Sequence, residues 1–125
     1  MTKISRIVAR QIFDSRGNPT IEAEVFSGKV SASAICPSGA STGTYEAFEK
    51  RDKSNKKYLG KSVFKAIDLI NKKISKKLQG QNIHNQERID SIMINLDGTK
   101  QKIKLGANAI LAVSMASKKL SAKLK

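Results

Sequence analysis

The chain has 125 residues, which suits one domain and leaves no room for two domains of ordinary size. Its 24 Lys and Arg residues outnumber its 10 Asp and Glu residues, so its net charge is +14 and it would attract anionic partners at low salt. The basic residues are spread along the chain without interleaved aromatic residues or a known binding motif, so we expect no dedicated nucleic-acid partner.

Apolar residues and the single cysteine bear on the location of the protein. The longest uninterrupted apolar run covers residues 109–113, far short of the ~20 residues that span a bilayer, and no apolar segment near Met1 suits a signal peptide. Cys36 cannot form an internal disulfide, and its place in an alternating apolar run predicts a small buried side chain. We therefore expect a cytoplasmic protein with no membrane span.

Three strands are predicted before residue 37. Residues 4–13 are rich in Ile and Val and predict a strand that can include a bulge. Residues 20–26 and 29–36 alternate apolar and polar side chains, which is typical of half-buried strands. The turn formers at 14–19 and the short Ser27-Gly28 turn connect these strands as an antiparallel meander.

Seven small residues follow the third strand, with the sequence PSGASTG at 37–43. Small side chains let the backbone approach another surface closely, and the hydroxyls of Ser and Thr can offer oxygens to a hard cation or donors to a phosphate. By composition alone the stretch is more typical of a flexible turn, and both interpretations stay open at this point.

The remaining segments predict helices. Residues 44–52 suit a short helix, residues 61–78 a long one with apolar side chains at helical spacing, and residues 85–94 and 108–123 two more. A strand meander followed by helices indicates an α+β fold, here a three-stranded antiparallel meander and a bundle of three to four helices. We expect one domain over residues 1–125, with strands at about 3–36, a loop at 37–45 and helices at about 46–123.

Six short motifs follow one another along the chain: DSRGNPTIE at 14–22, PSGASTG at 37–43, EAFEKRD at 46–52, YLGK at 58–61, LDGT at 96–99 and LGANAILAVS at 105–114. In this order and spacing the chain resembles the amino-terminal domain of the enolases (phosphopyruvate hydratases), from about Ile4 to about Leu120. The resemblance implies a lyase of glycolysis that, when complete, dehydrates 2-phosphoglycerate to phosphoenolpyruvate. Enolases carry their acid–base residues and tight magnesium site on a carboxy-terminal barrel, which has no counterpart in this sequence, so we expect the chain alone to be inactive.

The resemblance also assigns roles within the small-residue stretch. It implies that Ser41 ligates the second Mg²⁺ of the complete enzyme, that Gly39 and Ala40 lie close to the substrate phosphate, and that Ser38, Thr42 and Gly43 complete an active-site loop. A neutral serine without clustered carboxylates holds magnesium poorly. We therefore expect weak or absent Mg²⁺ binding by this chain alone.

Charged residues near the amino terminus admit two interpretations. By residue type alone, Arg10, Arg16 and Glu22 are exposed charges worth under ~1 kcal/mol each if paired. The resemblance implies that they contact the barrel of a partner subunit in a homodimer or higher oligomer, and that they lack partners within this chain. The lone His84 is typical of a surface polar group or helix cap rather than a catalyst, which needs an oriented partner.

Two other functions compete with an enolase domain. The chain could be a stand-alone truncated paralogue that acts as an interaction module for anionic partners or for a full enolase. Nucleic-acid binding through charge alone is a weaker third hypothesis. In an enolase domain, we expect helix 108–123, which is rich in small residues, to form part of the surface on which the barrel docks.

Overall fold

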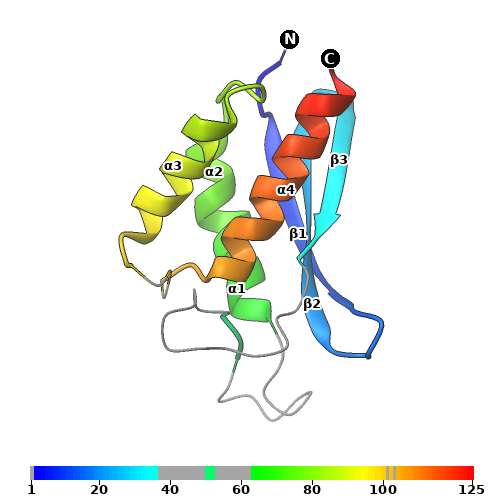
Figure 1. Cartoon of the computed structure of the whole chain (residues 1–125), viewed down its shortest axis with the longest axis vertical. Helices are drawn as coiled ribbons and strands as arrows, with labels where there is room; N and C mark the ends of the chain where they lie inside the picture. Colours follow the sequence, from blue (N-terminus) through cyan, green and yellow to red (C-terminus); the bar gives the residue numbers. More distant parts are fainter. Residues whose placement is uncertain (1, 37–49, 53–62, 101, 103) are drawn as a thin grey trace.

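Strands and helices form two layers in the computed structural model, which describes residues 2–36, 50–52, 63–100, 102 and 104–125 (Figure 1). The strands β1 (Arg6–Phe13), β2 (Pro19–Ser27) and β3 (Val30–Ile35) form a three-stranded antiparallel sheet in the order β1-β2-β3. The helices follow the strands along the chain and cover one face of the sheet. The predicted α+β meander is confirmed.

The predicted bulge in the first strand is wrong. The pairing of β1 with β2 runs without interruption from Arg6 opposite Phe26 to Phe13 opposite Pro19. Ile4 lies before β1, where it is buried and exchanges backbone hydrogen bonds with Gly80 and Gln81. The register of the sheet is therefore undisturbed.

Three helical rods occur within the described part of the chain. The first is continuous through α1 (Phe64–Leu69), a π-helical segment η2 (Ile70–Ile74) and α2 (Ser75–Leu78). The others are α3 (Gln86–Asp97) and α4 (Ala107–Lys123). These rods confirm the helices predicted at 61–78, 85–94 and 108–123, whereas the π-helical segment was not predicted. Of the helix predicted at 44–52, residues 44–49 lie outside the described residues and residues 50–52 are not helical.

The hydrophobic core lies between the sheet and the helices. Ile21, Ala23 and Val25 of β2 are fully buried, as their alternation predicts. Helix α4 packs on β2 and β3, the rod α1–η2–α2 packs on β1, and α3 packs against α4 and α2. Cys36 is buried at 3% exposure, which confirms its predicted place among the core side chains.

The small side chains of α4 face this core. Ala109, Ala112, Ala116 and Ser117 are all fully buried, and they let the helix approach the sheet closely. These residues therefore serve packing within the chain, whereas Leu111 on the same helix is 42% exposed, so the prediction that helix 108–123 forms part of a docking surface stays a prediction. No helix in the described ranges is both long and apolar enough to cross a bilayer.

Side chains of the first rod cover the outer edge of β1. The side-chain amide of Asn71 accepts a hydrogen bond from the Ala9 N–H (2.8 Å) and donates one to the Ala9 carbonyl (3.3 Å). One turn later the Ser75 hydroxyl accepts from the Ile7 N–H at 3.1 Å. An exposed strand edge can pair with another chain, and these contacts satisfy the edge within the molecule.

Candidate functional site

The site predicted from the sequence is anchored at one end of the molecule. Its predicted loop residues Ser38, Gly39, Ala40, Ser41, Thr42 and Gly43 lie outside the described residues. The residues on either side, Cys36 and Lys50, are described, and hydrogen bonds tie Cys36 to β2 and Lys50 to α4. The geometry of the site is therefore that of these two ends and of the side chains that hold them.

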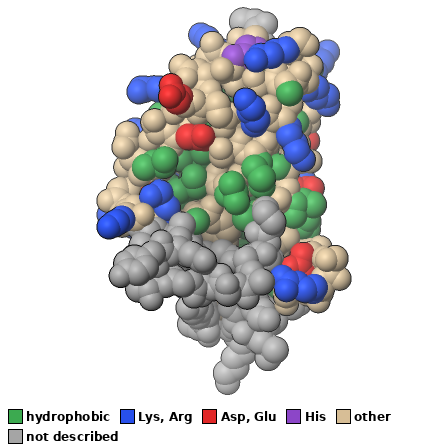
Figure 2. All heavy atoms as spheres, in the orientation of Figure 1, with side chains coloured by type: hydrophobic (Ala, Val, Ile, Leu, Met, Phe, Trp, Pro, Cys, Tyr) green, Lys and Arg blue, Asp and Glu red, His purple; other side chains and the backbone are tan. Residues whose placement is uncertain are grey.

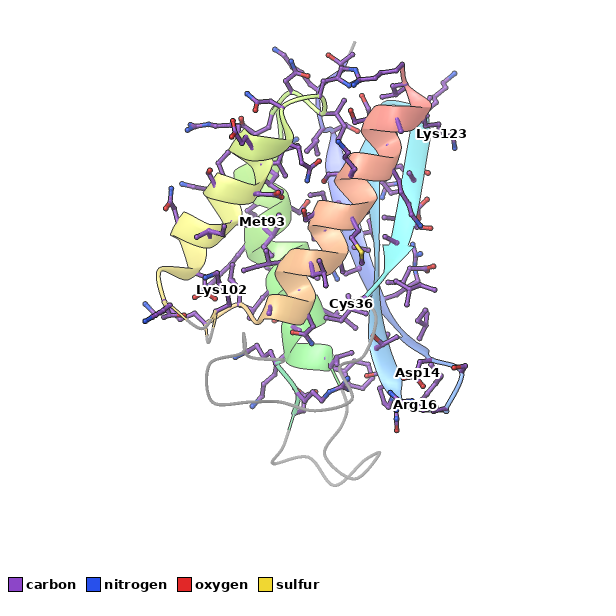
Figure 3. All side chains as sticks on the ribbon, viewed as in Figure 1. Asp14, Arg16, Cys36, Met93, Lys102 and Lys123 are labelled. Carbon is purple, nitrogen blue, oxygen red and sulfur yellow. The ribbon has the colours of Figure 1, made fainter. Side chains whose placement is uncertain are left out.

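The first end is tied to β2. The Cys36 N–H donates to the Ile21 carbonyl at 2.9 Å, which extends the β2–β3 ladder by one residue beyond β3. The Thr20 hydroxyl, itself only 3% exposed, donates to the Cys36 carbonyl at 2.7 Å. Both backbone groups of Cys36, labelled in Figure 3, are thus held immediately before residue 37.

The second end is tied to the first turn of α4. The Asn108 side chain accepts from the Lys50 N–H at 2.9 Å and donates to the Lys50 carbonyl at 3.0 Å. Asn108 is 4% exposed, so its amide depends on these partners for hydrogen bonding. A planar amide that bonds both groups of one residue fixes the position and the orientation of that backbone.

Gly106 makes this contact possible. Its backbone has φ 92° and ψ 136°, a region in which side chains other than glycine are strained. A Cβ on residue 106 would lie 2.5 Å from the Lys50 Cβ and 2.6 Å from the Asn108 Oδ1. The motif at 105–114 therefore has a physical basis, because glycine provides the space in which Asn108 reaches Lys50.

The next two residues extend the attachment to other elements. The Arg51 guanidinium donates to the Pro19 carbonyl at 2.8 Å. The Asp52 carboxylate, 4% exposed, accepts from the backbone N–H groups of Phe64 (2.9 Å) and Lys65 (3.2 Å). It thereby caps α1, whose own N-cap residue supplies no side-chain hydrogen bond. Residues 50–52 join the first turns of α1 and α4 to the start of β2.

Asp97 organises the turn that leads to Gly106. Its carboxylate accepts from the Leu105 N–H at 2.7 Å, and from the N–H and the hydroxyl of Thr99. Burial pushes the pKa of Asp97 upward, but the hydrogen bonds from Thr99 and Leu105 outweigh burial and hold the pKa below its ordinary value. The carboxylate thus serves to hold the turn between α3 and α4.

His84 lies at the opposite end of the molecule, where it is the purple side chain in Figure 2. Its Nδ1 is 2.7 Å from the Ser121 hydroxyl near the end of α4. The ring thus links the residues that precede α3 to α4, which agrees with the predicted structural role.

Arg10 and Glu22 face each other on the sheet surface that carries no helix. They pair directly in the β1–β2 register, and Arg10 contacts the carboxylates of Glu22 at 2.6 Å and Glu24 at 2.8 Å. Hydrogen bonds from Arg10 and then Ser31 lower the pKa of Glu24. The prediction that these side chains lack partners in this chain is wrong for Arg10 and Glu22, because cross-strand neighbours of opposite charge come together in any such register.

Arg16 differs from these two residues. It lies in the β1–β2 turn, and its side chain points away from the body of the molecule (Figure 3). The turn is held by the Asp14 carboxylate, which accepts from the N–H groups of Arg16 and Asn18, both at 2.9 Å. Within the described residues, no acidic side chain is paired with the Arg16 guanidinium.

The described residues do not fit a metal site by themselves. No group of three or more His, Cys, Asp and Glu side chains that could hold a metal ion occurs within residues 2–36, 50–52, 63–100, 102 and 104–125. The buried carboxylates Asp52 and Asp97 are each occupied by backbone N–H groups from their own surroundings.

Sequence reasoning missed the side chains that hold the ends of residues 37–49. Thr20, Arg51, Asp52 and Asn108 belong to the motifs at 14–22, 46–52 and 105–114, yet no role was assigned to them. Asn108 is a polar residue at a buried position of a helix, and this was the signal that could have revealed its role. Its partner Lys50 is 58 residues away in the sequence and becomes evident only in three dimensions.

Comparisons with known proteins agree with the resemblance in the motifs. A family model described as "Enolase, N-terminal domain" matches residues 4–125. The chain is 78% identical over 125 residues to an enolase of Pelagibacter ubique (strain HTCC1062), covering 100% of this chain and 30% of that relative. It is 53% identical over 119 residues to an enolase of Methanococcoides burtonii (strain DSM 6242), covering 95% of this chain and 28% of that relative. The chain thus spans about 30% of the length of the curated relatives it matches.

Proposed function

Because the chain belongs to the family of enolase N-terminal domains, we propose that residues 1–125 form one domain of an enolase. The complete enzyme dehydrates 2-phosphoglycerate reversibly to phosphoenolpyruvate in the cytoplasm. One observation carries the proposal beyond family membership. The residues that hold both ends of residues 37–49 come from the shared motifs, so these motifs serve to present that segment. The domain contributes the segment, and the remaining length of the protein contributes the acid–base chemistry.

The roles proposed within residues 37–49 follow the resemblance. Ser41 offers its oxygens to a Mg²⁺ ion that is held mainly by groups outside this chain. Gly39 and Ala40 lie next to the substrate phosphate, and Ser38, Thr42 and Gly43 complete the active-site loop. Magnesium, when bound, would stabilise negative charge that develops on the substrate. The described residues offer no carboxylate cluster for the ion, so this chain alone is expected to bind it weakly and to be inactive.

Two surfaces fit the proposed protein partners. Apolar side chains gather over the lower halves of α3 and α4 in Figure 2. Ile94 of α3 is 44% exposed and Leu111 of α4 is 42% exposed, and an apolar surface of this kind suits the barrel domain.

The exposed guanidinium of Arg16 suits a carboxylate of a second subunit, and the Arg10–Glu22 pair lies on the same sheet. Sedimentation of the complete enzyme with Arg16→Glu, which should shift the dimer toward monomer, tests the subunit contact.

A chimera tests the proposed function. Residues 1–125 replace the matching 30% of the Pelagibacter ubique enolase, and formation of phosphoenolpyruvate from 2-phosphoglycerate is followed with magnesium. We expect the chimera to be active, the isolated chain to be inactive, and Ser41→Ala to lower kcat/KM of the chimera by at least about tenfold through loss of a metal-site group. An inactive but folded chimera, or an active isolated chain, would contradict the proposal.

A further inference from the structure

Both ends of residues 37–49 converge on two consecutive residues of β2. The Thr20 hydroxyl holds the Cys36 carbonyl, and the neighbouring Pro19 carbonyl accepts from Arg51, the residue after Lys50. Lys50 itself is held through both its backbone groups by Asn108. The entry and the exit of the segment are therefore tied to the same corner of the sheet and to the first turn of α4.

Asn108 has no other evident task in the fold. It does not cap α4, because the N-cap of that helix is Gly106 and makes no side-chain cap hydrogen bond. Its Oδ1 and its Nδ2 are both engaged with the backbone of Lys50, which belongs to no helix or strand. Gly106 lies so near that an added Cβ would be 2.5 Å from the Lys50 Cβ. Two hydrogen bonds to one buried side chain therefore hold the backbone of Lys50 beside the first turn of α4.

The fold contains a matched example of the same chemistry. Asn71 bonds the N–H and the carbonyl of Ala9 as Asn108 bonds those of Lys50, with distances of 2.8 and 3.3 Å against 2.9 and 3.0 Å. Asn71 completes the edge of β1, a purely structural position, whereas Asn108 holds the residue that follows 37–49. Loss of either amide leaves one backbone residue without its hydrogen-bond partners.

From this geometry we infer that Asn108 and Thr20 are positioning residues for the catalytic reaction. They hold the exit and the entry of residues 37–49, and thereby set where the groups proposed to contact substrate stand relative to the rest of the site. The inference rests on the proposed function, because it takes residues 37–49 to carry those groups. A misplacement of about 1 Å at a reacting site can lower the rate by about 100-fold.

The test compares Asn108→Ala and Thr20→Val with Asn71→Ala in the chimera of this chain and the Pelagibacter ubique enolase. For Asn108→Ala and Thr20→Val we expect a fall in kcat/KM of about 10- to 100-fold that includes a rise in KM, since loosened contacts weaken substrate binding. A simple loss of folded enzyme lowers the apparent kcat and leaves KM unchanged. Asn71→Ala should lower the Tm less than Asn108→Ala does, because Asn71 is exposed and water can replace its hydrogen bonds, and it should keep kcat/KM within about twofold of the parent.

A second readout is independent of activity. Hydrogen–deuterium exchange of peptides covering residues 37–52 should be faster in Asn108→Ala than in the parent chimera and unchanged in Asn71→Ala. Equal exchange in this region for both variants, or an equal effect of both on KM, would overturn the inference. If the parent chimera is inactive the proposed function fails, and the exchange result alone decides whether Asn108 holds the segment. If Asn108→Ala does not fold, Thr20→Val, which preserves the shape of the side chain, decides on the same measurements.

Discussion

Single polar side chains replace secondary structure at several points of this molecule. Asn71 and Asn108 each bond the N–H and the carbonyl of one backbone residue, as a neighbouring strand would. The Asp97 carboxylate accepts from the N–H groups of Leu105 and Thr99 and from the Thr99 hydroxyl, and so holds the turn before α4. Buried backbone groups need such partners, so each of these residues is tied to one specific arrangement of the chain.

Gly106 offers the sharpest residue-level prediction. Gly106→Ala should destabilise the fold by about 2–4 kcal/mol, because it combines a strained backbone with overlap against Lys50. Gly28→Ala is the matched control, since Gly28 has φ 60° and nothing within 4 Å of an added Cβ, and it should lose only about 1 kcal/mol. Urea denaturation gives both values. Equal losses would show that Gly106 is required for its dihedral angles alone.

Asp97 should make stability depend on pH. Because its pKa is lowered in the folded state, its contribution is complete above the unfolded pKa of about 4 and is lost as the pH falls through the folded value. Asp97→Asn should therefore destabilise the protein at pH 7 by about 1–3 kcal/mol. This gap, the difference in free energy of unfolding between the variant and the parent, should narrow below about pH 4.

Denaturation at pH 7, 5, 4 and 3 measures this gap, with Asp68→Asn as the control. Asp68 is exposed and pairs with Lys72 at 3.1 Å, so its replacement should change stability by under ~0.5 kcal/mol. A gap that stays constant from pH 7 to pH 3 would mean that Asp97 acts through shape rather than charge.

At the scale of elements, the first rod depends on residues outside it. Asp52 caps the start of α1 from another segment, and Gln11 of β1 accepts from the N–H of Val63 just before the helix. Further along, the rod continues through η2, and β1 is reached by Asn71 of η2 and by Ser75 at the start of α2. Local sequence gives the rod its apolar stripe, but its start is stabilised by contacts with other elements.

Replacement of the external cap tests this dependence. Asp52→Ala should lower stability by about 1–2 kcal/mol, as loss of a helix cap does, and should speed hydrogen exchange at Phe64 and Lys65 first. Asp68→Ala, on the exposed face of the same rod, is the control and should leave this exchange unchanged. Unchanged exchange in Asp52→Ala would show that the cap is dispensable.

At the scale of the whole molecule, positive charge dominates the surface. Blue side chains are scattered over the face shown in Figure 2, in keeping with a solvated surface rather than one binding patch. Within the described residues the acidic side chains of Glu22, Glu24 and Asp68 form ion pairs with Arg10 or Lys72. The net charge of +14 already counts all 10 acidic residues, so 14 positive charges have no acidic counterpart in the chain and repel one another.

Added salt should stabilise the chain at pH 7. Raising NaCl from 0.01 to 0.15 M shortens the screening length from about 30 to about 8 Å, which weakens repulsion among the lysines, so the Tm should rise. The double variant Lys76→Gln with Lys77→Gln removes two exposed charges from α2 and should show a smaller rise. A Tm that falls with salt would show that attractive pairs outweigh the net repulsion.

The sequence by itself determined the strands, the three described helices and the family. Alternation in β2 and apolar spacing in the first rod depend on neighbouring residues, so Ile21, Val25, Ile70 and Ile74 could be placed in the core without a structure. The motifs could be read as the mark of an enolase domain, although the reasons for Gly106 and Asn108 could not.

Tertiary structure decided the polar contacts that surround the candidate site. Lys50 and Asn108 are 58 residues apart, Arg51 reaches Pro19 across 32, and no periodicity links either pair. The same limit explains why Arg10 was expected to lack a partner that its strand register supplies. Burial can be predicted from local pattern because every apolar side chain gains from leaving water, whereas a hydrogen bond requires two particular groups that only the assembled fold brings together.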